Sequence, residues 1–190
     1  MVSALISARK EHGEPMGKTT PPNKILLLCG LICSSDDIYN QALAALIEQI
    51  GPVGIDTITF PFDHTDYYTA EMGSGLTRRF IAFDELMNPD RLAGVKLMTN
   101  EIEARLSDNR DCRRINIDPG YLSLNNLVLA STKNFAHRLY LKDGIYGEIT
   151  LIYQNGAFTT LPWTYPDYRD IRALGYFTQL RQNLKIKIKK

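Results

Sequence analysis

The stretch KILLLCGLI (24–32) decides the fold of this chain, because nearly all of its side chains are apolar. A strand with one buried face alternates apolar and polar residues, whereas a strand buried on both faces is apolar throughout. The run therefore predicts a central strand of a sheet, covered on both of its faces.

Helical and extended segments alternate on the C-terminal side of this strand. Residues 34–37 (SSDD) supply an N-cap and acidic groups for a first helix, which Gly51-Pro52 ends. Pro89, after Asn88, marks the start of a second helix. The other strands predicted from the apolar patterns are 53–60, 77–87 and 113–118. The order, β-α-β-β-α-β, is that of a ferredoxin-like fold, in which both helices cover one face of an antiparallel sheet.

The second half of the chain adds strands and a final helix. Asp143-Gly144 lies between two alternating runs, which is the signal of a type I′ hairpin. A strand at 127–131 precedes this hairpin, and a helix is expected from about Asp167 onward. The predicted fold class is α+β: a ferredoxin-like β-α-β-β-α-β core with an added antiparallel β-meander and a C-terminal helix.

Length and charge limit the domain organisation and the classes of partner. A chain of 190 residues suits one domain, and we expect a mobile N-terminal tail (1–22), a single α+β domain (23–184) and a basic C-terminal tail (185–190). The net charge of +1 gives no overall field that attracts nucleic acid or a membrane. RNA binding is disfavoured further, because the strands lack the aromatic pattern of RNA-binding sheets. No apolar run reaches membrane-spanning length.

The cysteines and the N-terminal residues indicate the cellular compartment in which the protein is expected. Cys29, Cys33 and Cys112 are odd in number and form no CxxC pair, so we expect reduced thiols and a cytoplasmic protein. The first residues lack the apolar region of a signal peptide, and Met16 is an alternative start.

The segment GEPMGKTT (13–20) resembles a phosphate-binding loop but does not fit one. Such a loop has four residues between its first glycine and Gly-Lys, whereas Gly13 and Gly17 enclose three. Pro21-Pro22 also interrupt the helix that should follow. The segment STKNF (131–135) lacks the acidic residue of a GTPase base-reading motif, so no known nucleotide motif is present.

The loop DHTDYYTAEMG (63–73) gathers carboxylates, an imidazole and two phenols. No HxH or HxxxH spacing occurs in it, so we assign no metal. Tyr67, Tyr68 and Glu71 are candidates for ligand contact, because functional groups concentrate on loops that a rigid sheet holds. The alternative is a polar surface loop anchored by its tyrosines.

The hairpin geometry predicts a pair of ionisable side chains. A two-residue turn at Asp143-Gly144 would place Leu139 opposite Glu148 and His137 opposite Thr150. His137 and Glu148 would then be diagonal neighbours on one face, roughly 7–8 Å apart. A carboxylate beside an imidazole raises its basicity, so the pair is a candidate for acid–base chemistry. The alternative is an ordinary cross-strand polar pair.

Basic and aromatic residues nearby suggest an anion site. Arg79, Lys133 and Arg138 would supply positive charge for a phosphate or a carboxylate. Arg79 alternates with Ile81 and Phe83, so an anionic partner is expected for it. Trp163 lies in PWTYPDYR (162–169). It either stacks on a ligand ring or belongs to a rigid corner that docks the last helix, with Asp167 as the N-cap of that helix.

The motif INIDPGYLS (115–123) presents a further carboxylate. Asp118, Pro119 and Gly120 fit the first three positions of a type II turn. Strand alternation places Asn116 and Asp118 on one face, so both are candidates for the site.

Three long segments carry a family resemblance: TDYYTAEMGSGLTRRFIAFDELMNPDRLAGVKLMTNEIE (65–103), INIDPGYLSLNNLVLASTKNFAHRLYLKDGIYGEITLIY (115–153) and PWTYPDYR. They resemble the prokaryotic family known as domain of unknown function 4416, over about residues 24–181. The resemblance implies no enzyme class, although some members carry a GTP-binding label. The recurring polar motifs of the family fall on Tyr67, Tyr68, Glu71, Arg79, Asn116, Asp118, Lys133, His137, Arg138, Glu148 and Asp167.

These observations favour a pocket for an anionic small molecule, phosphorylated or a nucleotide. The candidate acid–base residues are His137, Glu148 and Asp118. The candidate ligand contacts are Tyr67, Tyr68, Glu71, Arg79, Asn116, Lys133, Arg138 and Trp163. No cofactor is assigned, and whether the protein is an enzyme stays open. The alternative is a non-catalytic interaction module, whose polar residues would scatter over separate surfaces.

Overall fold

A computed structural model describes residues 17–108 and 112–189 of the chain, without the side chains of residues 55–57. Most of the predicted N-terminal tail therefore lies outside the described residues. The strands are β1 (Ile25–Cys33), β2 (Val53–Pro61), β3 (Thr77–Met87), β4 (Ile115–Leu122), β5 (Asn126–Ser131), β6 (Arg138–Lys142), β7 (Ile145–Gln154) and β8 (Ala157–Thr160). The α-helices are α1 (Asp36–Ile50), α2 (Thr69–Met72), α3 (Leu92–Arg105), α4 (Pro166–Arg169) and α5 (Ile171–Lys187), and a 3₁₀ turn (Pro89–Arg91) precedes α3.

One antiparallel sheet holds the eight strands of the described residues, in the order β2-β3-β1-β4-β5-β7-β6, with β8 paired to β7. Helices on an antiparallel sheet confirm the α+β class. Strand β1 lies between β3 and β4, and all nine of its residues are buried. The central strand predicted from the apolar run is therefore confirmed.

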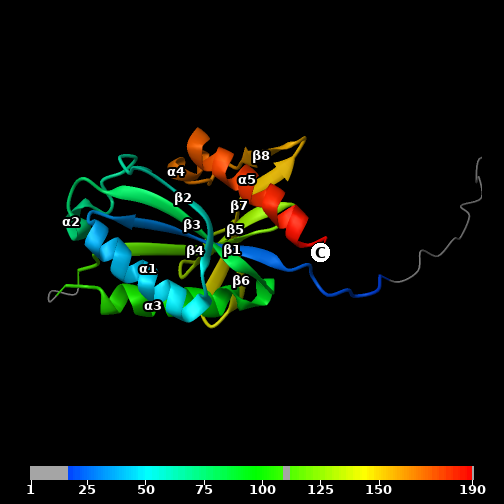
Figure 1. Cartoon of the computed structure of the whole chain (residues 1–190), viewed down its shortest axis with the longest axis horizontal. Coiled ribbons are helices and arrows are strands. Elements are labelled where there is room, and N and C mark those ends of the chain that lie inside the picture. The colour runs from blue at the N-terminus through cyan, green and yellow to red at the C-terminus, as the bar shows by residue number, and fades with distance from the viewer. Residues whose placement is uncertain (1–16, 109–111, 190) are drawn as a thin grey trace, which may run out of the picture.

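Helices cover both faces of the sheet at β1. On one face, Leu27, Cys29 and Leu31 pack with apolar residues of α1 and α3. On the other face, Leu26 and Leu28 pack with residues of α5. Figure 1 shows α1 and α3 side by side on one side of the sheet, and α5 on the opposite side. None of the helices described is long and apolar enough to cross a membrane.

The sheet divides between β4 and β5. Strand β4 pairs with β1 along its whole length, but only Gly120, Tyr121 and Leu122 pair with β5. The predicted type II turn at Asp118 is therefore wrong, because the strand continues through it to Leu122. Pro119, which has no N–H to donate, lies just beyond the last β4–β5 pair. At Gly120 a Cβ would lie 2.6 Å from the carbonyl oxygen of Val128, so only glycine permits this approach of β5.

Two side chains of α3 bind the edge of β4 that β5 leaves open. Lys96 Nζ donates to the carbonyl oxygen of Ile117 at 3.0 Å, and the Ile117 N–H donates to Glu103 Oε1 at 2.6 Å. Both peptide groups of Ile117 are thus satisfied without a neighbouring strand. The gap between β4 and β5 stays open along the part of β4 that precedes Gly120.

The register of the β6–β7 hairpin differs from the predicted one. The turn has the expected positive φ at Asp143 and Gly144, but the register shifts between Tyr140 and Lys142. Leu141 forms a bulge and packs over Gly147. A Cβ added at Gly147 would lie 3.3 Å from the Cδ2 atom of Leu141. Arg138, not Leu139, is therefore the direct partner of Glu148.

The C-terminal segment also differs in detail. The predicted helix is divided in two, and Asp170, not Asp167, accepts a hydrogen bond from the backbone at the start of α5. Asp167 is buried within α4 instead. Ile171, the first residue of α5, is 81% exposed. Helix α5 runs to Lys187 and so includes the first residues of the predicted basic tail.

Candidate functional site

A hollow of about 300 Å³ occupies the gap where β4 and β5 diverge. We call it the cationic pocket, after the four basic side chains that line it with two carboxyl groups: Lys96, Arg113, Lys133, Arg138, Glu103 and Asp118. A second hollow of about 400 Å³ adjoins it on the side of α4. We call this one the aromatic pocket, after the rings of Phe62, His64, Tyr67, Tyr68 and Tyr165.

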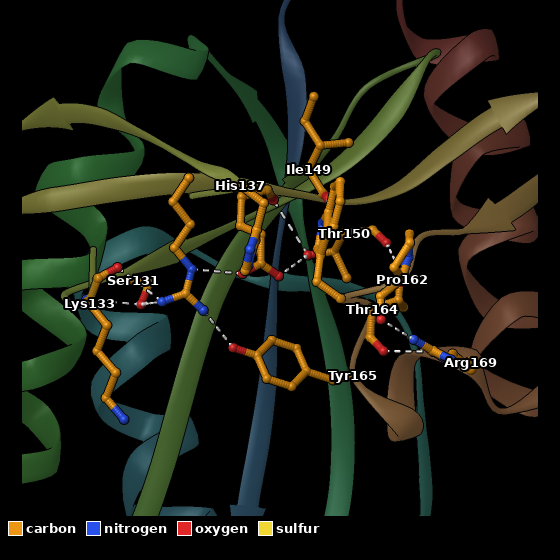
Figure 2. Close-up of polar contacts among 12 residues, drawn as sticks. Ser131, Lys133, His137, Ile149, Thr150, Pro162, Thr164, Tyr165 and Arg169 are labelled. Carbon is orange, nitrogen blue, oxygen red and sulfur yellow. Dashed lines mark hydrogen bonds and ion pairs between the residues drawn. The ribbon is translucent and has the colours of Figure 1, made fainter. Parts of the chain in front are cut away.

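Arg138 is held in one orientation by four hydrogen bonds, and Figure 2 labels three of the residues that accept them, Ser131, Lys133 and Tyr165. Its Nε donates to Glu148 Oε2 at 2.7 Å, and its Nη1 donates to the Ser131 hydroxyl and to the carbonyl oxygen of Lys133. Its Nη2 donates to the Tyr165 hydroxyl at 2.8 Å. The guanidinium is buried, and it fixes the backbone from which the Lys133 side chain extends.

His137 and Trp163 lie behind this arginine and do not line either pocket. His137 Nε2 is 3.0 Å from Glu148 Oε2, so the predicted contact exists although the register differs. The imidazole stacks between Phe135 and Trp163, at centroid distances of 5.9 and 4.9 Å. The Trp163 indole donates to the carbonyl oxygen of Ile149 at 2.8 Å. This geometry suits a support for Glu148 better than a group that touches a ligand.

The loop that carries α2 closes the pockets on one side. Phe62 and Met72 bury their side chains against Ile32 and so anchor the loop. Tyr67 Oη accepts a hydrogen bond from Lys133 Nζ at 3.2 Å, and this contact lowers the pKa of the Tyr67 phenol. Tyr68 lies deeper, and burial raises the pKa of its phenol.

A second contact ties the loop to strand β4. Arg113 Nε donates to Glu71 Oε2 at 2.7 Å, and Arg113 Nη1 donates to Asn116 Oδ1 at 3.3 Å. Asn116 Nδ2 in turn donates to Asp118 Oδ2 at 2.8 Å. Glu71 therefore acts through Arg113, whereas Asn116 lies in the wall of the cationic pocket and links Arg113 to Asp118.

Beneath Asp118 lies a buried ion pair. Arg78 Nη2 is 2.5 Å from Asp167 Oδ2, and Arg78 Nη1 is 3.5 Å from Asp118 Oδ2. The Arg78 side chain is 4% exposed and that of Asp167 is 3% exposed, so two charges are held out of water. Gly30 makes room for them, because a Cβ there would lie 2.8 Å from Arg78 Nη1.

Glu103 is a buried carboxyl group on the wall of the cationic pocket. Burial raises its pKa from 4.5 to about 7, against the opposing effects of Lys96 and of the hydrogen bond from the Ile117 N–H. The group is therefore partly protonated at neutral pH, which weakens its repulsion of an anion. Its position, seven residues after Lys96 on α3, places both side chains on the helix face toward β4.

The raised pKa of Glu103 predicts a pH dependence of stability. The unfolded carboxyl ionises near pH 4.5 and the folded one near pH 7. The folded state therefore binds the extra proton, and stability is lost as the pH rises from about 4.5 to 7. By linkage the loss is on the order of 3 kcal/mol. We expect Glu103→Gln to remove much of this pH-dependent loss of stability, as measured by urea unfolding between pH 5 and 8. Glu101→Gln, on the exposed side of α3, should keep the wild-type slope, and equal slopes in all three proteins would contradict the prediction.

The structure brings together most of the residues predicted for the site. Six of them line the cationic pocket: Tyr67, Tyr68, Asn116, Asp118, Lys133 and Arg138. Glu71 and Glu148 each bind an arginine of the pocket wall. Arg79 lies on the opposite face of the sheet, where it pairs with Asp36 and covers the ring of Tyr39. Its neighbour Arg78 is the arginine on the pocket side.

Sequence reasoning missed Lys96, Glu103 and Tyr165 as pocket residues. The sequence held one signal for Lys96 and Glu103, because these two oppositely charged residues lie next to the apolar stripe of the predicted helix. Tyr165 lies in the aromatic motif PWTYPDYR, from which only Trp163 was chosen as a ligand contact. Within the described residues, no group of three or more His, Cys, Asp or Glu side chains is arranged to hold a metal ion.

Comparison with known proteins gives a family but no relative of established function. A family model described as "domain of unknown function (DUF4416)" matches residues 23–184. No curated protein and no solved structure matches the chain.

Proposed function

The chain belongs to the DUF4416 family, as the match over residues 23–184 shows, and from this premise we propose that its cationic pocket binds an anionic small molecule. The observation that carries the proposal is Lys133. Lys133 lines the pocket, and within the described residues its ammonium group contacts the hydroxyl and ring of Tyr67 rather than a carboxylate. A lysine without a carboxylate partner is available to an anion.

The charges around Lys133 support the same proposal. Among the described residues Lys96 forms no contact ion pair, since its Nζ donates to the carbonyl oxygen of Ile117, and it acts on Glu103 through its charge alone. Arg113 and Arg138 are paired with Glu71 and Glu148, which lie behind the wall rather than on it. The pocket thus presents the nitrogen donors of Arg113 and Arg138, which Glu71 and Glu148 orient from outside, beside the two carboxyl groups of Glu103 and Asp118 that also line it.

The remaining candidates have supporting roles in this proposal. Glu148 orients Arg138, which in turn holds the backbone of Lys133, and His137 braces Glu148. Tyr67 covers the bound anion and exchanges its contact with Lys133 for one with the ligand. If the site performs chemistry, Asp118 and Glu103 are the carboxyl groups that border the ligand.

We expect Lys133→Gln to weaken anion binding by about 10-fold or more, because a hydrogen bond to a charged group contributes roughly 1.5–3 kcal/mol. Binding would be measured by calorimetry after a thermal-shift screen with phosphate, pyrophosphate, sugar phosphates, nucleotides and carboxylates. Lys185→Gln, which removes an exposed lysine of α5, should bind as the wild type does. The affinity should also fall with added salt.

Failure of every anion to stabilise the wild-type protein would overturn the proposal. Equal affinities of the Lys133→Gln and wild-type proteins would place the anion elsewhere.

A second candidate function, protein association without chemistry, is favoured by one observation. Strand β6 lies at one edge of the sheet, and its Leu139, Tyr140 and Leu141 are exposed, with Leu139 at 73%. An exposed apolar edge strand is a template for pairing with another chain. The anion screen separates the two functions, because association alone predicts no response to any anion.

We also propose that β1–β4 with α1 and α3 constitute a ferredoxin-like unit, which the order β2-β3-β1-β4 and the antiparallel pairings support. We further propose that the protein is prokaryotic and cytoplasmic. The free cysteines Cys29, Cys33 and Cys112 favour the cytoplasm.

A further inference from the structure

The cationic pocket and the aromatic pocket meet along a shared wall. Five residues border both of them: Tyr67, Tyr68, Asp118, Lys133 and Tyr165. Together the two hollows have the size of a site for a small organic ligand rather than for an inorganic ion alone. Their chemistry differs, and the difference indicates what the ligand carries at each end.

The rings of the aromatic pocket are fixed by one another and by neighbouring charges. Phe62 and Tyr68 meet edge to face at a centroid distance of 5.8 Å, and Tyr67 and Tyr68 do so at 4.9 Å. The hydroxyl of Tyr165 is held by Arg138. Aromatic rings whose positions are fixed in this way form a site that favours a further flat ring.

The aromatic pocket offers no cation of its own for an anion. Arg78 borders it, but its guanidinium is buried and its charge faces the carboxylates of Asp167 and Asp118. Lys133 stands at the junction, and Arg113 and Lys96 lie on the other side of it. A ligand that fills both hollows therefore places its negative group in the cationic pocket and its uncharged part among the rings.

We infer that the ligand is an aromatic anion: a flat ring joined to a phosphate or carboxylate group, with the ring in the aromatic pocket and the anion at Lys133. This inference rests on the proposed function and narrows it. The ring would lie beside Phe62, His64 and Tyr68, where stacking favours binding of an aromatic ring over a saturated ring of similar size.

The test compares phenyl phosphate with cyclohexyl phosphate, which have the same charge and nearly the same size, and with inorganic phosphate. Calorimetry on the full chain should give an affinity for phenyl phosphate about 3- to 10-fold above that for cyclohexyl phosphate. Inorganic phosphate should bind more weakly than either ester. Tyr68→Leu should reduce the preference to less than about 2-fold, and His64→Leu provides a second variant if Tyr68→Leu does not fold. Tyr140→Leu, on the exposed face of β6, should keep the wild-type preference.

The outcomes separate this inference from the proposed function. Equal binding of the two esters would overturn the aromatic ligand and leave the anion site in place. A preference that persists in both Tyr68→Leu and His64→Leu would overturn the position assigned to the ring. Absence of binding by all three phosphates and by every other anion screened would overturn the anion site itself.

Discussion

Arg78→Met is expected to lower the free energy of unfolding by about 3–5 kcal/mol, because it leaves a buried carboxylate without its partner. Asp167 is 3% exposed and lies 2.5 Å from the guanidinium that the substitution removes. The change also removes a cation that lies within 5.5 Å of the ring centroids of Phe62, Phe80 and Tyr168. Urea unfolding followed by circular dichroism would measure the loss.

The next residue in the chain provides a matched control. Arg79 pairs with Asp36, whose side chain is 84% exposed, so Arg79→Met should cost less than about 1 kcal/mol. The double variant Arg78→Met/Asp167→Asn should be more stable than the sum of its single variants implies, because it leaves no fully buried carboxylate unpaired and Asp118 is 28% exposed. Similar losses in Arg78→Met and Arg79→Met would contradict this account of the buried pair.

Glu148→Gln is expected to lower the free energy of unfolding by about 3 kcal/mol, because it leaves the buried guanidinium of Arg138 without its carboxylate. The Glu148 side chain is 2% exposed, and its Oε2 binds both Arg138 and His137. Where the variant folds, its affinity for anions should also fall, since Arg138 holds the backbone of Lys133. Unfolding in urea and calorimetry on the same preparation would test both effects.

His137→Gln distinguishes the two partners of Glu148. The His137 side chain is a quarter exposed, so its loss should cost less than about 1 kcal/mol. A loss as large as that of Glu148→Gln would show that the imidazole, not the guanidinium, is the main partner. If both variants leave anion binding unchanged, the His137–Glu148 pair serves the fold alone.

The cationic pocket exists because β4 and β5 separate before Gly120. Pro119-Gly120 marks this place in the sequence, but the sequence alone does not explain the separation. Pro119-Gly120 reads locally as a turn, because these residues favour one. In the folded chain both lie within β4, where proline coincides with the end of pairing to β5 and glycine permits the close approach of Val128. A local pattern cannot distinguish these cases, since the partner strand decides whether an N–H is needed.

Side-chain partners across the site were predictable only where they lie close in the chain. The contact of His137 with Glu148 followed from a hairpin, whose two strands are neighbours in sequence. Even there the bulge at Leu141 changed the register, and Arg138 became the direct partner of Glu148. The isolated Gly147 was the signal for this bulge, because a glycine inside a strand often marks a close approach.

The sequence by itself determined the α+β class, the buried central strand, the order of the first helices and strands, and the family. These depend on apolar periodicity, on caps and on long motifs, which are local properties of the chain. Only the tertiary structure decided that Arg78 rather than Arg79 faces the pockets, and that Asp167 is its partner rather than a helix cap. The reason is physical: a buried charge needs an opposite charge nearby, and which group meets that need depends on how distant strands and helices pack.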